Sequence, residues 1–129
     1  MSYAYVDPSC LVALAFGEAG ARAVRARLES YERLYSANLL EAELRAALVR
    51  ERVAWHPDLV AAIGWVLPAR RLTEEIAHAL AVGYLRGADL WHVACALHLQ
   101  RAVGDLDFMT LDATQRQVAA AAGLRTPTF

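Results

Sequence analysis

The sequence YAYVDPS, residues 3–9, decides the fold, because it joins a short apolar strand to a helix through an acidic residue. Asp7 ends the apolar residues 3–6, and Pro8 and the apolar run 10–16 predict that a helix follows. In an open α/β sheet, ligands bind at the carboxyl ends of the strands, where loops and helix starts converge. Asp7 is therefore a candidate binding residue. The alternative is that Asp7 only caps the helix, with Pro8 at the first helical position.

Short apolar runs and helical patterns alternate along the rest of the chain. We expect further strands at 34–37 and 108–111 and a terminal strand at 124–126. The expected helices are 9–16, 19–29, 38–51, 57–66, 73–85, 88–100 and 113–122. This alternation predicts an α/β fold in which a central parallel sheet is flanked by helices. No linker, repeat or low-complexity stretch divides the chain, so we expect one domain over residues 1–129.

The helix expected at 38–51 carries a carboxylate on its apolar side. At roughly 100° per residue, Glu43 falls inside the apolar sector of the helical wheel, whereas Glu41 and Arg45 fall at its edge or outside. The sector consists of Leu39, Leu40, Leu44, Ala46 and Ala47. A buried carboxylate without a partner is costly, so it is normally paired or bound to a metal. Glu43 is thus a candidate metal ligand, and a salt bridge to an arginine is the alternative.

Two more acidic residues stand at comparable positions. Asp89 lies on the inward side of an almost wholly apolar helix, although an acid in a first turn also complements the helix dipole. Asp112 ends a strand-like run and precedes the last helix, where N-capping is the competing explanation. Asp105 and Asp107 are assigned to a solvated turn, and Asp107 stays open as an alternative to Asp112.

Four short motifs surround these carboxylates, namely YVDPS at 5–9, AELRAA at 42–47, ADLWHVA at 88–94 and FMTLD at 108–112. Sites at which Mg²⁺ or Mn²⁺ acts on phosphates gather carboxylates from several chain segments in this way. In their order and spacing the motifs resemble those of the PIN-domain nucleases, and among them the small VapC-like toxins of bacterial toxin-antitoxin pairs. The resemblance covers essentially the whole chain.

The resemblance implies a PIN-like three-layer sandwich with an acidic site for one or two Mg²⁺ or Mn²⁺ ions. The implied catalytic and metal-binding residues are Asp7, Glu43, Asp89 and Asp112, with Ser9 and Thr110 supporting them through hydroxyl hydrogen bonds. Two positions depart from the family pattern. Pro8 stands where such proteins more often carry a small polar residue, and Trp91 is bulkier than the usual neighbour of the central aspartate. Neither departure removes a ligand.

The activity that the resemblance implies is that of a metal-dependent endoribonuclease, in which a water activated by the metal attacks an RNA phosphodiester. The implied partners are the RNA substrate, a cognate antitoxin that occupies the site, and a second copy in a homodimer. A different class of function stays open. The domain is then a non-catalytic RNA-binding or protein-interaction module, whose carboxylates only cap helices and pair with arginines. Stabilisation by Mg²⁺ or Mn²⁺ separates the two interpretations.

The charged residues narrow the choice of function. All 13 basic side chains are arginines, and the absence of lysine excludes chemistry that needs a lysine amine and argues against a phosphoryl-receiver domain. A haloacid-type phosphatase is disfavoured because Asp7-Pro8-Ser9 lacks its second aspartate. Arginine suits bidentate contacts with phosphate. The net charge of -1, however, is unlike that of a typical free nucleic-acid-binding protein.

The cysteines and histidines form no metal-ligand motif. Cys10 and Cys95 lie in apolar stretches and are expected to be buried, reduced thiols. His92, one helical turn after Asp89, either packs as a structural residue, orients that carboxylate or contacts substrate. The apolar run 10–16 is too short to span a bilayer and does not follow a basic region, so we expect a cytoplasmic protein without a membrane segment.

Overall fold

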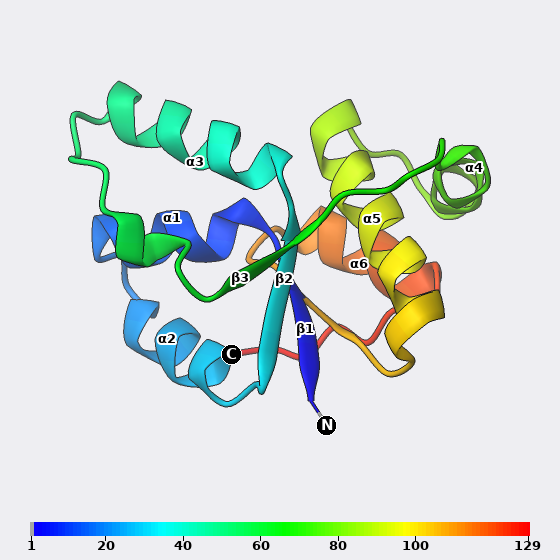
Figure 1. The fold of residues 1–129 in the computed structure, drawn as a ribbon, viewed down its shortest axis with the longest axis horizontal. Coiled ribbons are helices and arrows are strands. Elements are labelled where there is room, and N and C mark those ends of the chain that lie inside the picture. The colour runs from blue at the N-terminus through cyan, green and yellow to red at the C-terminus, as the bar shows by residue number, and fades with distance from the viewer. Residues whose placement is uncertain (1) are drawn as a thin grey trace.

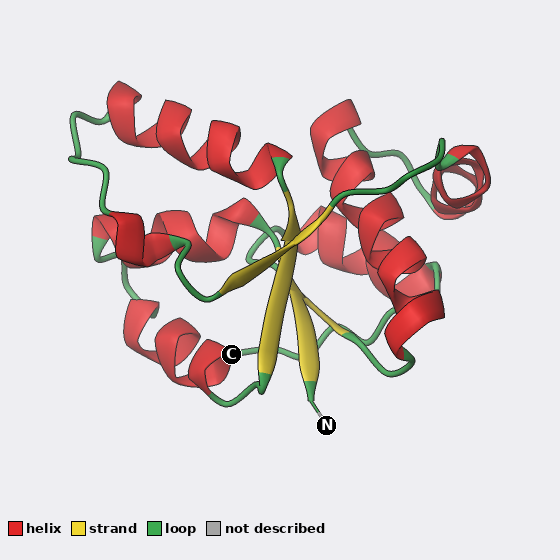
Figure 2. Cartoon of the chain, in the orientation of Figure 1, coloured by secondary structure: helices red, strands yellow, loops and turns green. Residues whose placement is uncertain are grey.

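Four short parallel strands form the centre of the structure, a computed structural model that describes residues 2–129. Within these residues the strands are β1 (Tyr3–Val6), β2 (Arg33–Ala37), β3 (Ile63–Val66) and β4 (Asp107–Met109). The helices are α1 (Pro8–Phe16), α2 (Ala21–Glu29), α3 (Leu39–Arg50), α4 (Thr73–Val82), α5 (Gly87–Val103) and α6 (Ala113–Ala121), with a 3-10 turn at Pro57–Leu59. The strand order is β3-β2-β1-β4. Figure 2 shows that the sheet is small beside the helices that cover it.

The sheet lies between two layers of helices (Figure 1). Helices α1, α2 and α3 cover one face, and α4, α5 and α6 cover the other. Because successive side chains of a strand point to opposite faces, Ala4 and Val6 of β1 belong to the first core and Tyr5 to the second. All three side chains are fully buried. The predicted α/β fold, with a central parallel sheet in a three-layer arrangement, is confirmed.

The junction after β1 fixes the position of the first predicted acid. The Asp7 N–H donates to the Met109 carbonyl at 2.9 Å, which ties the end of β1 to the end of β4. Pro8 occupies the first turn of α1, where its missing N–H has no helical partner to lose. The helix ends at Gly17, whose left-handed backbone (φ 62) suits glycine. Asp7 is therefore held at the carboxyl edge of the sheet.

Two segments differ from the sequence prediction. The helix expected at 57–66 is wrong, because only Pro57–Leu59 forms a 3-10 turn and Ile63–Val66 is the edge strand β3. Gly64 lets this strand pass close to β2, since a Cβ at that position would lie 3.0 Å from the Tyr35 ring. The strand expected at 124–126 is reduced to an isolated bridge between Arg125 and Asp107.

The other elements match the prediction apart from their ends. Helix α4 ends at Val82, short of the expected position 85, and α5 continues beyond position 100 to Val103. The buried side of α3 consists of Leu40, Leu44 and Leu48, so Ala46, expected in the apolar sector, is exposed. Among the helices within residues 2–129, none has both the length and the apolar composition to cross a membrane.

Candidate functional site

The four predicted acidic residues lie around one edge of the sheet. Asp7 follows β1 and Asp112 lies just beyond β4, so both stand at the carboxyl ends of paired parallel strands. Asp89 lies in the first turn of α5, and Glu43 lies in the second turn of α3. Burial raises the pKa of Asp89, and the charges of Asp7, Asp112 and Glu43 raise it further, against the opposing charge of Arg86. The charge of each of the other three carboxylates therefore acts on Asp89.

Asp7 and Asp112 are also helix caps, as the competing explanation for each of them proposes. Asp7 is only 5% exposed, and its Oδ2 accepts the Ser9 N–H at 2.9 Å at the start of α1. Asp112 is exposed, and its Oδ1 accepts the Gln115 N–H at 2.9 Å at the start of α6. Neither Asp89 nor Glu43 makes such a cap bond. Capping thus accounts for Asp7 and Asp112, and Asp89 lies in the first turn of α5, where an acid complements the helix dipole as its competing explanation proposes.

Glu43 is paired with a histidine, so the alternative explanation, a salt bridge to an arginine, is wrong. Its Oε1 lies 2.5 Å from Nε2 of His92 on α5, and its side chain is 28% exposed. Glu41 behaves as a surface residue instead. It lies 3.1 Å from Nε of Arg45 one turn along α3 and is 44% exposed. The helical wheel therefore separates the two glutamates correctly, because only Glu43 faces the rest of the fold.

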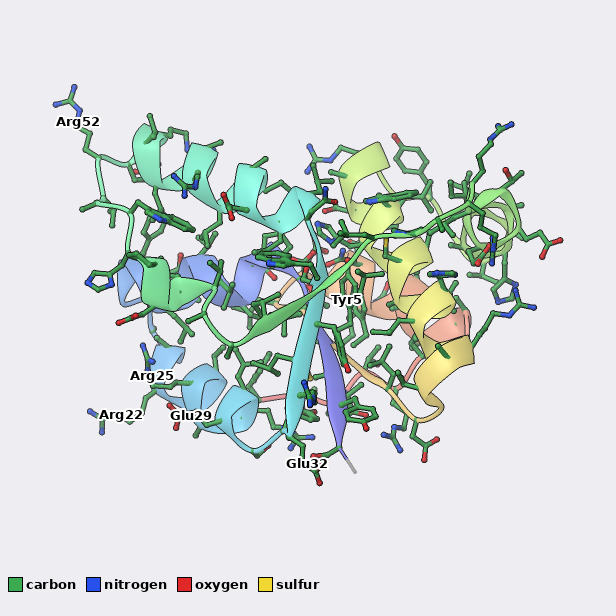
Figure 3. All side chains as sticks on the ribbon, viewed as in Figure 1. Tyr5, Arg22, Arg25, Glu29, Glu32 and Arg52 are labelled. Carbon is green, nitrogen blue, oxygen red and sulfur yellow. The ribbon has the colours of Figure 1, made fainter. Side chains whose placement is uncertain are left out.

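His92 connects Glu43 to the sheet. Its Nδ1 lies 2.6 Å from the hydroxyl of Tyr5, which points from β1 toward the layer that contains α5 (Figure 3). Because the Tyr5 oxygen already accepts the Ala37 N–H at 3.0 Å, its own proton is available to His92 Nδ1. In the tautomer that accepts this proton at Nδ1, the His92 Nε2–H donates to Glu43. His92 is fully buried, which agrees with the interpretation that it packs as a structural residue, and its ring nitrogens contact Tyr5 and Glu43, so the alternative that it orients Asp89 is wrong.

Gln115 was not predicted, yet it joins three of the acidic segments. Its Nε2 donates to Asp7 Oδ1 at 3.0 Å and to the Asp89 carbonyl at 3.3 Å, and its Oε1 accepts the Thr110 hydroxyl at 2.6 Å. The spacing of Asp112 and Gln115 is that of a capping box, in which the glutamine would bond the Asp112 N–H. Here Thr110 Oγ1 accepts that N–H at 3.1 Å, which frees Gln115 to reach Asp7.

The two hydroxyls expected to support the site lie between the strand ends. Ser9 Oγ and Thr110 Oγ1 are 3.3 Å apart, and Ser9 Oγ accepts the Leu111 N–H at 3.0 Å. Through these bonds Ser9 and Thr110 hold the start of α1 against the segment after β4. They act on the backbone that carries Asp7 and Asp112, and through Gln115 on the Asp7 side chain.

Asp107 lies at the opposite end of β4 from Asp112. It begins the strand rather than a solvated turn, accepts the Tyr31 hydroxyl at 2.6 Å and pairs with Nε of Arg125 at 2.8 Å. Asp105 lies 3.7 Å from the same arginine. This placement favours Asp112 over Asp107 as the fourth acid, because only Asp112 lies beside Asp89.

The chemistry of the donor set fits a hard divalent cation. The candidate ligands are all carboxylates, and burial raises the pKa of the Cys10 and Cys95 thiols to about 12, so neither is available as a thiolate. Oxygen donors of this kind suit Mg²⁺ or Mn²⁺. Within residues 2–129, no three acidic, histidine or cysteine side chains lie close enough together to form a complete metal site. Binding a cation would therefore require some of the carboxylates to turn toward it.

Comparison with known proteins identifies the family. A search among curated proteins finds no match. The family model of the PIN domain matches residues 4–124, a range that contains all of the predicted site residues. The fold, with its parallel sheet between two helical layers, agrees with that match. This chain therefore belongs to the PIN domain family.

Proposed function

We propose that this protein is a divalent-metal-dependent endoribonuclease that hydrolyses RNA phosphodiester bonds. PIN domains are generally nucleases, so membership of the family supports phosphodiester hydrolysis. The observation that carries the proposal is the gathering of Asp7, Glu43, Asp89 and Asp112 from four separate segments around one edge of the sheet. Capping alone does not explain this arrangement, because Glu43 and Asp89 cap no helix.

The four carboxylates would hold one or two Mg²⁺ or Mn²⁺ ions. When bound, such an ion supplies Lewis-acid chemistry, which lowers the pKa of a water molecule and neutralises charge on the phosphate. His92 holds Glu43 through Oε1, and within residues 2–129 Oε2 of that carboxylate makes no hydrogen bond or ion pair. Gln115 holds Asp7 through Oδ1, and Oδ2 of the same carboxylate accepts the Ser9 N–H. Hydrogen bonds of this kind keep ligand carboxylates oriented for a cation.

We further propose that the protein is the toxin of a VapC-like toxin-antitoxin pair, with a homodimer as its working form and a cognate antitoxin that covers the acidic site. The four sequence motifs support this assignment through their resemblance to such toxins. A physical reason supports the inhibitor, since a ribonuclease without one would damage the RNA of its own cell. Copurification with a coexpressed candidate antitoxin, followed by loss of RNA cleavage in the complex, tests this part of the proposal.

The decisive variant is Glu43→Gln, with Glu41→Gln as its matched control. The amide keeps the shape of Glu43 and still accepts the His92 proton, but it lacks the charge that a hard cation needs. We expect Glu43→Gln to abolish Mn²⁺-dependent RNA cleavage and Glu41→Gln to leave it nearly unchanged, because Glu41 only pairs with Arg45 at the surface. Cleavage is followed on labelled RNA with Mn²⁺ and with EDTA. Equal cleavage by both variants would overturn the assignment of Glu43.

A non-catalytic module of the same fold is the second candidate, and one observation favours it. Asp7 and Asp112 cap helices, and Glu43 is paired, so each of these three carboxylates has a structural partner without a metal. A cation that binds only the folded protein stabilises it by about 2.7 kcal/mol at 100 times its dissociation constant. Thermal melts with EDTA and with saturating Mn²⁺ separate the candidates, because a merely capping set of carboxylates gives no such shift.

A further inference from the structure

A small hollow lies directly beside the acidic site. Its volume is about 250 Å³. It is lined by Tyr84, Leu85, Arg86, Asp89, Asp112 and Thr114. Asp89 and Asp112 belong to the proposed metal site, so any group in the hollow lies next to the place where a phosphodiester would be cut.

Tyr84 presents an aromatic ring to solvent at this hollow. It lies in the coil between α4 and α5 and is 77% exposed. Within residues 2–129 its ring takes part in none of the aromatic contacts, which join Tyr3 to Tyr35 and Tyr5 to His92 and Phe108. Exposed aromatic rings on nucleic-acid-binding surfaces serve as platforms on which unpaired bases stack. Tyr84 has the exposure that such a platform requires.

Arg86 places a positive charge in the same hollow. It lies two residues after Tyr84, is exposed, and has an extended backbone at the start of α5. Its guanidinium takes part in none of the ion pairs found within residues 2–129, although its charge reaches Asp89. A guanidinium beside a group of carboxylates offers the phosphate of a nucleic acid a favourable contact at a site whose other charges repel it.

We propose that Tyr84 and Arg86 form a subsite for one unpaired nucleotide of single-stranded RNA, with the base stacked on Tyr84 and a phosphate paired with Arg86. The subsite rests on the proposed function, which makes RNA the substrate of the neighbouring carboxylates. The exposed ring of Tyr84 matches the base of a nucleotide, and the guanidinium of Arg86, which makes no ion pair within residues 2–129, matches its phosphate. This match favours RNA over a peptide as the occupant.

Binding without cleavage tests the subsite. The dissociation constant of a fluorescein-labelled single-stranded RNA, and of the same strand in a duplex, is measured by anisotropy in EDTA. We expect the wild type to prefer the single strand. Tyr84→Leu should weaken single-strand binding about tenfold, the loss of one stacked base, and Tyr84→Trp should preserve it. Arg86→Gln should lower the slope of log Kd against log salt concentration by about 0.7, the loss of one phosphate contact.

Matched controls come from the opposite end of the molecule. Phe129→Leu removes another exposed aromatic ring, at the chain end that Figure 1 places near the starts of the strands. Arg22→Gln removes an exposed arginine of α2, which Figure 3 shows far from α5. Neither control should change RNA affinity. Equal weakening by Phe129→Leu and Tyr84→Leu would overturn the subsite, since stacking at one place would then not explain the loss.

The outcomes also separate the subsite from the proposed function. One outcome is that the wild type cleaves RNA with Mn²⁺ and that Tyr84→Leu and Arg86→Gln bind the single strand as tightly as wild type. This outcome overturns the subsite alone and marks the hollow as a surface for a protein partner. If the wild type cleaves no RNA and the two variants lose affinity as expected, the result supports the subsite and overturns the proposed nuclease activity. Equal binding of single strand and duplex by the wild type overturns the subsite as well.

Discussion

Asp89 carries a charge that the folded protein disfavours, because burial and the neighbouring carboxylates raise its pKa. A carboxyl group whose pKa is raised by folding binds more protons in the folded state, so its charge lowers stability as the pH rises above the unfolded value of about 3.9. We expect Asp89→Asn to melt at a higher temperature than wild type at pH 7 in EDTA. The gain should shrink as the pH falls toward 4, and it should vanish only well below the unfolded pKa, where the wild-type carboxyl is protonated in both states. Thermal melts at several pH values check this, and a gain that is the same at pH 4 and pH 7 would contradict it.

Asp7 should respond to the same change with the opposite sign. Both of its carboxylate oxygens accept hydrogen bonds, from the Ser9 N–H at 2.9 Å and from Gln115 Nε2 at 3.0 Å, and the side chain is buried. Asparagine has one acceptor oxygen, so Asp7→Asn leaves a buried donor without a partner, which costs about 1–3 kcal/mol. Urea unfolding in EDTA measures the loss. Asp112→Asn is the control, because this exposed cap has one helical N–H to accept and asparagine caps nearly as well.

Helical periodicity in the sequence distinguishes Glu43 from Glu41, because burial on a helix follows from spacing within one short segment. The partners of the acids could not be found in that way. Glu43 meets His92 from 49 residues away, and Asp7 meets Gln115 from 108 residues away. Such contacts depend on how α3, α5 and α6 pack around the sheet, and no local pattern encodes them. The placement of Asp112, rather than Asp107, beside Asp89 likewise depends on the direction of β4 in the sheet, which no local pattern encodes.

At the scale of elements, strand β3 shows why local pattern is sometimes insufficient. Its four residues Ile63–Val66 follow a proline-initiated turn and continue an apolar stretch, so a helix over 57–66 is a natural expectation. Burial alternates only partly along this edge strand, since Ile63 and Val66 are buried and Trp65 is exposed. Apolar runs of this length fit a short strand or a buried helix equally well. The apolar runs of β1, β2 and β4 are short and lead directly into a helical pattern, so the sequence predicts them as strands.

The close approach of β3 to β2 can be tested at Gly64. A Cβ there would lie 3.0 Å from Tyr35 Cδ1, and the Tyr35 ring packs edge-on against Tyr3 at 6.0 Å between centroids. We expect Gly64→Val to destabilise the protein by about 1–3 kcal/mol through overpacking, although valine favours strands. Urea unfolding measures the change. In a Tyr35→Leu background the same substitution should cost much less, and an unchanged cost would show that the ring is not the obstacle.

At the scale of the whole molecule, the parallel sheet has two unlike edges. Strand β3 forms one edge, and β4 forms the other. The Phe108 N–H of β4 donates to the Arg125 carbonyl at 2.7 Å, and the Arg125 side chain pairs with Asp107. The chain end thus covers part of the β4 edge with backbone hydrogen bonds. An uncovered strand edge is a template on which another chain can add.

We therefore expect the bridge at Arg125 to prevent self-association through β4. Removing residues 125–129 would expose the Phe108 N–H, and we expect the shortened chain to form larger species as its concentration rises, measured by light scattering. Arg125→Ala is the matched control, because it removes the ion pair with Asp107 and keeps the backbone bridge. If Arg125→Ala associates as readily as the shortened chain, the side chain rather than the backbone keeps neighbouring molecules apart. We thus expect residues 125–129 to set the concentration at which the sheets of neighbouring molecules begin to join.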